Sequence, residues 1–270
     1  MMKMLDGRVL AERIRERVAE KTREFGHQPG LAIILVGDDP ASHLYVQLKE
    51  KACEEVGFLF EKHVLPANTP TDQLVLLVKQ LNARGDIHGI LVQLPLPSQD
   101  EDAVIRTIHP AKDVDGFHPQ NSSLAPPTVL GIMKLIESTG ESITGKHACV
   151  VGSELFANPL QTFLAERGVE TTRLDPSSPT LAEQTKNYDI LITVVGKPGL
   201  ITSPMIKPDA IVIDVGTTRV DDKTVGDVDP SVAEANTGWL TPVPGGVGPM
   251  TVAMLILNVL RAAHLQHDGA

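Results

Sequence analysis

The stretch HACVVGSELFANPLQTFLAERGVETTRL (His147–Leu174) decides the fold. It begins with an apolar run that predicts a strand over His147–Gly152, and it ends with a shorter run that predicts a second strand over Glu170–Leu174. Between them, Phe156–Arg167 has the spacing of apolar residues that is typical of a helix. This order predicts a βαβ unit, which joins two parallel strands of one sheet.

The same alternation of strand and helix extends over most of the chain. A helix is expected from about Leu5 to Phe25, with Gly26 as its terminator. Further strands are predicted over Leu31–Gly37, Leu59–Leu65, Gly89–Leu96, Asp189–Gly196 and Ala210–Gly216, and further helices over Ser42–Val56 and Thr71–Ala83. The sequence therefore predicts an α/β protein with parallel sheets.

A polar, proline-containing break at NSSLAPPT (Asn121–Thr128) predicts a linker between two lobes. We expect a first lobe over residues 1–127 and a second, Rossmann-like nucleotide-binding lobe over residues 128–248, with an active-site cleft between them. The segment TPVPGGVGP (Thr241–Pro249) is expected to be a constrained loop. The apolar pattern of Met250–Leu265 predicts a buried helix, and the terminal segment 249–270 is expected to pack back on the first lobe.

The composition limits the classes of partner. The 24 basic and 34 acidic residues give a formal charge of −10, a sign that repels nucleic acid and anionic lipid. The amino terminus has no apolar run typical of a secretory signal, and no stretch reaches the ~18 apolar residues of a membrane span. Cys53 and Cys149 have no partner at metal-ligand spacing, so we expect buried thiols in a cytoplasmic, soluble protein with no metal site.

One predicted helix carries polar residues on a single face. Ser42, Tyr45 and Lys49 follow one another at steps of three and four residues, so their side chains project the same way. Taken alone, this pattern is better explained by a solvated lysine beside a tyrosine. In a closed cleft, however, desolvation lowers the pKa of a lysine and makes it usable for proton transfer.

Three other segments hold candidate site residues, and each of these can also be explained by a purely structural role. Gln93 lies in VQLPLP (Val92–Pro97), at the end of a predicted strand where ligands of parallel sheets bind, yet it could be a satisfied core amide. Asp113 and Asp115 in KDVDGFHP are either turn residues or carboxylates that accept N–H bonds from a heterocycle. The glycines of PGGVGPMT (Pro244–Thr251) allow close approach of a ligand, or form a rigid hinge.

Together, in this order, the words YVQLK, VQLPLP, KDVDGFHP, GDV and TPVPGGVGPMT resemble the FolD-type methylenetetrahydrofolate dehydrogenase/cyclohydrolase family of one-carbon metabolism, over about Asp6 to Leu260. The resemblance implies a bifunctional enzyme that oxidises 5,10-methylenetetrahydrofolate with a dinucleotide, NADP by resemblance, and hydrolyses the methenyl product to 10-formyltetrahydrofolate. It also implies a homodimer.

The resemblance assigns roles residue by residue. Tyr45 would stack on the aminobenzoyl ring of folate, with Ser42 beside it in the substrate site. Lys49 would serve the cyclohydrolase step, and Gln93 would hydrogen-bond Lys49. Asp115 would hold the pterin ring. The segment Pro244, Gly245, Gly246 and Val247 would line the same pocket.

The expected cofactor site departs from the family. Where relatives have G-R-S-x-x-V-G-x-P, this chain has GSELFANP (Gly152–Pro159), one residue shorter, with Ser153 and Glu154 at the usual Arg and Ser positions. Asp175 replaces a histidine and Thr217 an isoleucine. No basic residue is expected at the lost arginine's place, and the two acids would repel a 2′-phosphate. A carboxylate about 20 residues beyond the first glycine instead suits an unphosphorylated ribose, which favours NAD.

Two alternatives remain beside the bifunctional enzyme. The altered loop is also compatible with a monofunctional cyclohydrolase that has lost its cofactor. A third reading is a non-catalytic folate-binding paralogue, although such a protein has no evident need for the Lys49 and Gln93 pair.

Overall fold

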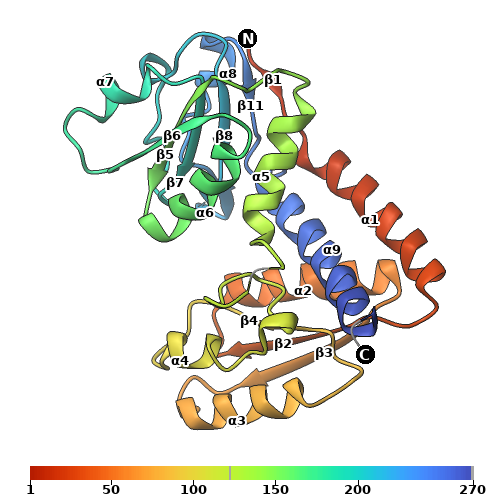
Figure 1. Cartoon of the computed structure of the whole chain (residues 1–270). Helices are drawn as coiled ribbons and strands as arrows, with labels where there is room; N and C mark the ends of the chain where they lie inside the picture. Colours follow the sequence, from red (N-terminus) through yellow and green to blue (C-terminus); the bar gives the residue numbers. More distant parts are fainter. Residues whose placement is uncertain (122, 269–270) are drawn as a thin grey trace. The chain divides into compact units, whose positions relative to one another are not determined.

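The structure, a computed structural model, describes residues 1–121 and 123–268, and the side chains of 1–121 and 123–267. Ser122 of the expected linker and the last two residues of the expected terminal segment lie outside the described residues. The chain forms two compact units (Figure 1). We name these units A and B. Unit A comprises Ala11–Pro127 and Val252–Ala270, and unit B comprises Met1–Leu10 and Thr128–Thr251.

Unit A is built on a three-stranded parallel sheet in the order β3–β2–β4. The strands are β2 (Gly30–Val36), β3 (Leu59–Leu65) and β4 (Gly89–Val92), and the helices are α1 (Gly7–Phe25), α2 (Pro40–Val56), α3 (Thr71–Asn82), α4 (Glu101–Ile105), η1 (Pro110–Lys112) and α9 (Val247–Asp268), of which α1 and α9 also contribute residues to unit B.

Both faces of that sheet are covered, because every residue of β2 is buried. Successive side chains of a strand point to opposite faces. Leu31, Ile33 and Leu35 therefore belong to one apolar core, together with residues of α2 and α9. Ala32 and Ile34 belong to another core, which α3 completes. This explains why β2 reads as a continuous apolar run rather than as an alternating one.

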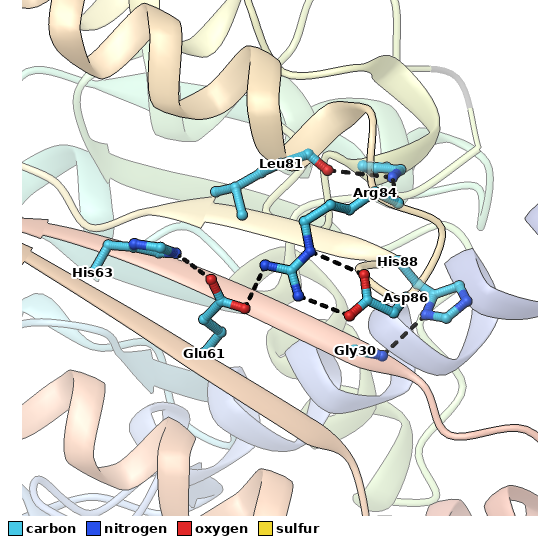
Figure 2. Close-up of polar contacts among 8 residues, drawn as sticks. Gly30, Glu61, His63, Leu81, Arg84, Asp86 and His88 are labelled. Carbon is cyan, nitrogen blue, oxygen red and sulfur yellow. Dashed lines mark hydrogen bonds and ion pairs between the residues drawn. The ribbon is translucent and has the colours of Figure 1, made fainter.

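The amino-terminal end of the same sheet carries a network of charged groups (Figure 2). Arg84 lies 2.6 Å from Glu61 of β3 through Nη1 and 2.7 Å from Asp86 through Nη2. The two carboxylates raise the pKa of this guanidinium above its ordinary value, chiefly through the Asp86 hydrogen bonds. His88 Nδ1 accepts a hydrogen bond from the backbone N–H of Gly30 at 3.0 Å. The network ties the starts of the strands to the end of α3.

Unit B is built on a six-stranded parallel sheet in the order β1–β11–β8–β7–β5–β6. The strands are β1 (Lys3–Met4), β5 (His147–Gly152), β6 (Glu170–Leu174), β7 (Ile190–Val194), β8 (Ile211–Asp214) and β11 (Trp239–Leu240). The helices are α5 (Pro127–Ser138), α6 (Glu154–Ala165), α7 (Leu181–Thr185), η2 (Ser203–Met205) and α8 (Val232–Ala235). A small antiparallel hairpin joins β9 (Thr218–Val220) to β10 (Lys223–Val225).

The strand order of unit B reverses direction beside β5. The chain passes from β5 outward to β6, and then back across β5 to β7 and β8. In open parallel sheets such a switch point leaves a crevice at the carboxyl ends of the strands, where nucleotides bind. Gly152 ends β5, and Val194 ends β7 beside it. The α/β prediction with a doubly wound second unit is confirmed.

Several predicted bounds differ from the observed ones, as for the helix predicted over Phe156–Arg167 and observed over Glu154–Ala165, and two of the differences bear on the site. The strand expected over Gly89–Leu96 ends at Val92, because the prolines that follow Leu94 and Leu96 cannot donate to a sheet ladder. Gln93 therefore lies just beyond the strand, although its N–H still bonds to Ile34 O at 2.8 Å. The loop expected over Thr241–Pro249 is shorter, since α9 already begins at Val247. A proline is tolerated at Pro249 because the first turn of a helix leaves its N–H groups unbonded.

The first ten residues group differently from the expected division at residue 127. They belong to unit B, because β1 pairs in parallel with β11, through Lys3 to Trp239 and Met4 to Leu240. Lys3 Nζ also lies 4.8 Å from the centre of the Trp239 ring. Two residues of strand are too few for a periodic pattern, so the sequence carries no signal for this pairing.

The last helix, α9, is a core helix. Its Val247–His267 stretch is long and apolar enough to cross a membrane by length and composition, the only such helix among the described residues, but 67% of that window is buried within the protein. Val252, Ile256 and Val259 belong to the core of unit A. Asn258 on the same helix is fully buried, and its amide donates to Val114 O at 3.0 Å. Cys53 and Cys149 are buried free thiols, as the sequence predicted.

Candidate functional site

The candidate catalytic face lies on α2 of unit A. Asp39 caps the helix, because its carboxylate accepts the N–H of Ser42 at 2.8 Å, and Pro40 occupies the first turn, where no N–H is needed. The helix buries Ser42 and Lys49 and leaves Tyr45 half-buried. Lys49 is only 8% exposed, so the solvated-lysine reading of this pattern is wrong.

The structure brings Lys49 and Gln93 together from different elements. Lys49 Nζ donates a hydrogen bond to Gln93 Oε1 at 2.9 Å. The other end of the Gln93 amide is fixed as well, since Nε2 donates to Leu94 O at 2.9 Å. The amide is thus held from both sides, and its oxygen points at the lysine. This geometry agrees with the contact that the family resemblance implies between the two residues.

Asp115 completes a group of facing charges. Burial raises the pKa of its carboxyl to about 6, a rise that Lys49 opposes and Asp113 increases. Burial likewise lowers the pKa of Lys49, and Asp115 opposes that change. Both shifts bring the two pKa values closer together, so moving a proton to or from either group costs less than it does for the free side chains. This is the arrangement that general acid and base chemistry requires.

Asp113 has a structural role instead. Its carboxylate accepts the N–H of Gly116 at 3.1 Å, the N–H of His118 at 2.8 Å and the side-chain amide of Asn121 at 2.9 Å. These bonds fix the turn that follows η1. Asp113 is therefore a turn residue, which was one of its two predicted roles. Asp115 is the acid whose charge acts on Lys49.

The segment Pro244–Val247 belongs to unit B. Gly245 has a φ of 119°, which only glycine adopts readily. A Cβ on Gly246 would lie 2.7 Å from Cβ of Thr241, and Pro244 O accepts a hydrogen bond from Arg8 Nη2 at 3.3 Å. The glycines are therefore explained by packing within the unit. The predicted contact of Pro244, Gly245, Gly246 and Val247 with folate stays a prediction.

The predicted cofactor residues begin at the turn from β5 into α6. A Cβ on Gly152 would lie 2.6 Å from Val194 Cγ1, so only glycine fits where the two strand ends meet. Ser153 caps α6 without a side-chain hydrogen bond to the helix, and Glu154 is the first helical residue. The first N–H groups of α6 thus have no capping side chain, which suits the phosphates of a dinucleotide. The residues present fit such a group.

A basic residue that the sequence analysis missed lies at this turn. Arg173 of β6 donates from Nη1 to Gly152 O at 3.1 Å, and its Nη2 lies 3.5 Å from Glu154 Oε1. A basic group therefore does lie beside this turn, although the sequence analysis expected none there. The sequence held a signal for it, because Arg173 lies only two residues before Asp175, the acid expected in the cofactor site.

Asp175 lies directly after β6, as expected for a ribose-binding acid. Its Oδ1 accepts the N–H of Ser177 at 2.8 Å and the Ser177 hydroxyl at 2.7 Å. These bonds lower the pKa of Asp175, and the charge of Arg173 lowers it further. Asp175 is a carboxylate at neutral pH and keeps Oδ2 as an acceptor.

Thr217 is exposed, in a loop that two buried acids hold in place. Asp214 accepts the N–H groups of Gly216 at 2.9 Å and of Asp227 at 3.0 Å. Asp227 accepts the N–H groups of Val195 at 2.7 Å and of Lys197 at 2.8 Å. Burial raises the pKa of Asp214 to about 6. The loops after β7 and β8 are thus fixed at the edge of the sheet where Gly152 lies.

Comparison with known proteins agrees with this arrangement. Residues 5–115 match the family model described as the catalytic domain of tetrahydrofolate dehydrogenase/cyclohydrolase, and residues 126–267 match the model of its NAD(P)-binding domain. The bifunctional protein FolD of Bordetella avium is 46% identical over 275 residues, which cover 97% of this chain and 97% of that protein.

Solved structures give the same result. The bifunctional enzyme FolD of Campylobacter jejuni aligns with a TM-score of 0.94 and 39% identity, covering 98% of this chain and 99% of that one. The Trypanosoma brucei FolD, a structure with NADP and an inhibitor, aligns with a TM-score of 0.93 and 36% identity, covering 98% of each chain. This chain belongs to the tetrahydrofolate dehydrogenase/cyclohydrolase family.

Proposed function

We propose that this chain oxidises 5,10-methylenetetrahydrofolate to 5,10-methenyltetrahydrofolate and hydrolyses that product to 10-formyltetrahydrofolate. The observation that carries the proposal is the buried contact of Lys49 Nζ with Gln93 Oε1 at 2.9 Å, with Asp115 as the opposing charge. Burying a lysine against a neutral amide costs free energy, and such perturbed groups cluster at functional sites. Membership of the family supports both reactions.

Four residues of the candidate site have parts in the hydrolytic step. Tyr45 stacks on the aminobenzoyl ring, and the Asp115 carboxylate accepts N–H bonds from the pterin. Water adds to the methenyl carbon and loses a proton, which leaves a hydroxyl on that carbon. The hydroxyl then loses its own proton to form the formyl C=O while the bond from carbon to N5 breaks and N5 is protonated, so one proton is released overall. Lys49, with its pKa lowered by burial, accepts and returns protons during these steps, and Gln93 keeps the amine in place.

Unit B binds a nicotinamide dinucleotide, which supplies the acceptor for the hydride that leaves the methylene carbon. The turn at Gly152 and Ser153 receives the phosphates. Asp175, with a free carboxylate oxygen after β6, accepts hydrogen bonds from an unphosphorylated ribose. Glu154 and Asp175 together make a 2′-phosphate unfavourable. NAD is therefore the preferred cofactor of this chain, although a relative was solved with NADP.

One alternative has an observation in its favour. Glu154 occupies the first turn of α6, at the place where a pyrophosphate would bind, and this favours a monofunctional cyclohydrolase that binds no dinucleotide. The non-catalytic folate-binding reading is disfavoured, because binding alone gives no reason to bury Lys49 against Gln93.

Two assays on the purified chain test the proposal. Reduced-nicotinamide absorbance is followed with 5,10-methylenetetrahydrofolate and either NAD or NADP, and loss of methenyltetrahydrofolate absorbance is followed separately. Both activities are expected, with NAD reduced faster than NADP. Hydrolysis without reduction of either cofactor would instead establish the monofunctional enzyme. Neither activity, in a chain that binds folate, would leave the non-catalytic reading.

The oligomeric state and the cellular location stay predictions. The resemblance implies a homodimer, and the sequence favours the cytoplasm. Light scattering on the purified chain distinguishes a monomer from a dimer of the 29.0 kDa chain.

A further inference from the structure

We propose that the ion pair between Arg173 and Glu154 sets the choice between NAD and NADP. Glu154 pairs with the Arg173 guanidinium, which would otherwise bind the 2′-phosphate of NADP. The inference rests on the proposed dehydrogenase activity and assigns its specificity to one pair of side chains. It differs from the acid-repulsion argument, in which Glu154 acts alone and Arg173 has no part.

The position of the pair supports this role. Arg173 reaches from β6 across the end of β5, where its Nη1 donates to Gly152 O at 3.1 Å. Gly152 is the residue at which the chain turns into α6, and Glu154 is the first residue of that helix. The guanidinium thus lies at the turn that would receive the dinucleotide phosphates, next to the carboxyl end of β6, where the ribose binds in parallel sheets.

The charges around the guanidinium explain why it does not select NADP. Glu154 lies 3.5 Å from Arg173 Nη2, and the Arg173 charge also lowers the pKa of Asp175, after the larger effect of the Ser177 hydrogen bonds. One cation therefore faces two carboxylates. A 2′-phosphate would bring up to two further negative charges to a site that is already negative. The ribose hydroxyl of NAD needs only the acceptor that Asp175 supplies.

The pair is weak enough to be exchanged. The side chain of Glu154 is 74% exposed and that of Arg173 is 35% exposed, and such pairs stabilise a protein little. A guanidinium binds phosphate in a forked geometry with two N–H bonds, which is stronger than a single contact with a carboxylate at 3.5 Å. Removing the Glu154 charge alone should therefore free Arg173 for a 2′-phosphate.

The test compares adenosine 2′,5′-bisphosphate with 5′-AMP, two probes that differ only in the 2′-phosphate, by titration calorimetry. The ratio of their dissociation constants is measured for the wild type, Glu154→Gln, Arg173→Gln and the double variant. Glu166→Gln serves as the control, since it removes one exposed charge at the far end of the same helix. The reduction rates with NAD and NADP are measured in parallel.

In Glu154→Gln the ratio should shift by about three- to tenfold in favour of the 2′-phosphorylated probe, as expected for one exposed charge pair acting on a dianion. Glu166→Gln should leave the ratio unchanged. In the Arg173→Gln background, Glu154→Gln should have little further effect, because the phosphate then has no guanidinium to bind.

Two results would overturn the inference separately from the proposed function. If the wild type binds and reduces a cofactor but Glu154→Gln leaves the ratio unchanged, the inference alone is wrong. It is equally wrong if the full shift persists without Arg173, since Glu154 then acts by simple repulsion. If the wild type binds neither probe and reduces neither cofactor, both the inference and the proposed dehydrogenase activity are wrong.

Discussion

At the scale of single residues, the site depends on two groups that burial moves in opposite directions. Burial raises the pKa of Asp115 to about 6 and lowers that of Lys49. Each group opposes the shift of the other, yet burial outweighs their attraction in both. Neither group is therefore expected to stabilise the fold through this pairing, because desolvation exceeds the gain from the attraction of the charges.

The raised pKa of Asp115 gives a prediction about pH. An acid whose folded pKa lies above its ordinary value stabilises the fold most when protonated, so its contribution is present below about pH 4 and is lost as the pH rises to about 6. The free energy of unfolding of the wild type, minus that of Asp115→Asn, should fall by about 1–3 kcal/mol over this range. Urea denaturation at several pH values measures this difference.

Folate binding should change in the other direction. In the proposed mechanism the Asp115 carboxylate, not the acid, accepts N–H bonds from the pterin, so affinity for the substrate should increase as the pH rises through about 6. Asp115→Asn should bind folate weakly at every pH and lose this inflection. An unchanged inflection in the variant would exclude Asp115 as the titrating group.

At the scale of elements, ends of helices and strands are held by buried polar side chains. Lys112 is 7% exposed, and its Nζ donates to the carbonyl oxygens of Asn82 at 3.0 Å and Arg84 at 2.5 Å, after the last turn of α3. Those carbonyls have no partner within the helix, so the lysine acts as a cap. Burial lowers the pKa of this lysine below its ordinary value.

Lys112→Met should leave these carbonyls buried without a donor. The expected loss of stability is about 1–3 kcal/mol. Lys79→Met, on the exposed side of α3, is the matched control and should change stability little. Chemical denaturation of both variants compares them directly, and equal midpoints for the two would contradict the capping role.

In unit B the segment after β8 is tightly packed, because Gly226 and Gly216 lie against the buried acids Asp214 and Asp227. A Cβ on Gly226 would lie 2.0 Å from Asp214 Oδ2, and one on Gly216 would lie 2.3 Å from Asp227 Cγ. Gly226→Ala should therefore destabilise the protein by about 1–3 kcal/mol through overpacking. Gly248→Ala, where a Cβ meets nothing within 4 Å, should be neutral or slightly stabilising. Thermal unfolding of the two variants checks the contrast.

Much of this element-scale structure was predictable, because its signals are local. The predicted strands over Leu59–Leu65, His147–Gly152 and Glu170–Leu174 have the observed bounds. Periodicity also placed Ser42, Tyr45 and Lys49 on one face of α2. By contrast, β1 and β11 have two residues each and pair across more than 200 positions, so no local pattern marks them. The start of α9 at Val247 was hidden by the proline and glycines around it.

At the scale of the whole molecule, the chain consists of two units that each enclose a core of their own. The order of motifs along the chain assigned the family, but the partners of each side chain depend on the fold. Lys49 and Gln93 are 44 positions apart, and their contact follows only from packing α2 beside the end of β4. Arg173 and Glu154 meet for the same reason, across the β5 and β6 pair, and single-sequence reasoning missed them.

The central claim is that Lys49 serves hydrolysis while a separate unit serves the cofactor. Its most direct test is the rate of methenyltetrahydrofolate hydrolysis by Lys49→Met, beside Lys51→Met as an exposed control on the same helix. Hydrolysis by Lys49→Met should fall by at least about 100-fold, the usual contribution of a positioned acid or base, while Lys51→Met retains the wild-type rate. Hydrolysis by Lys49→Met at the wild-type rate would contradict the account.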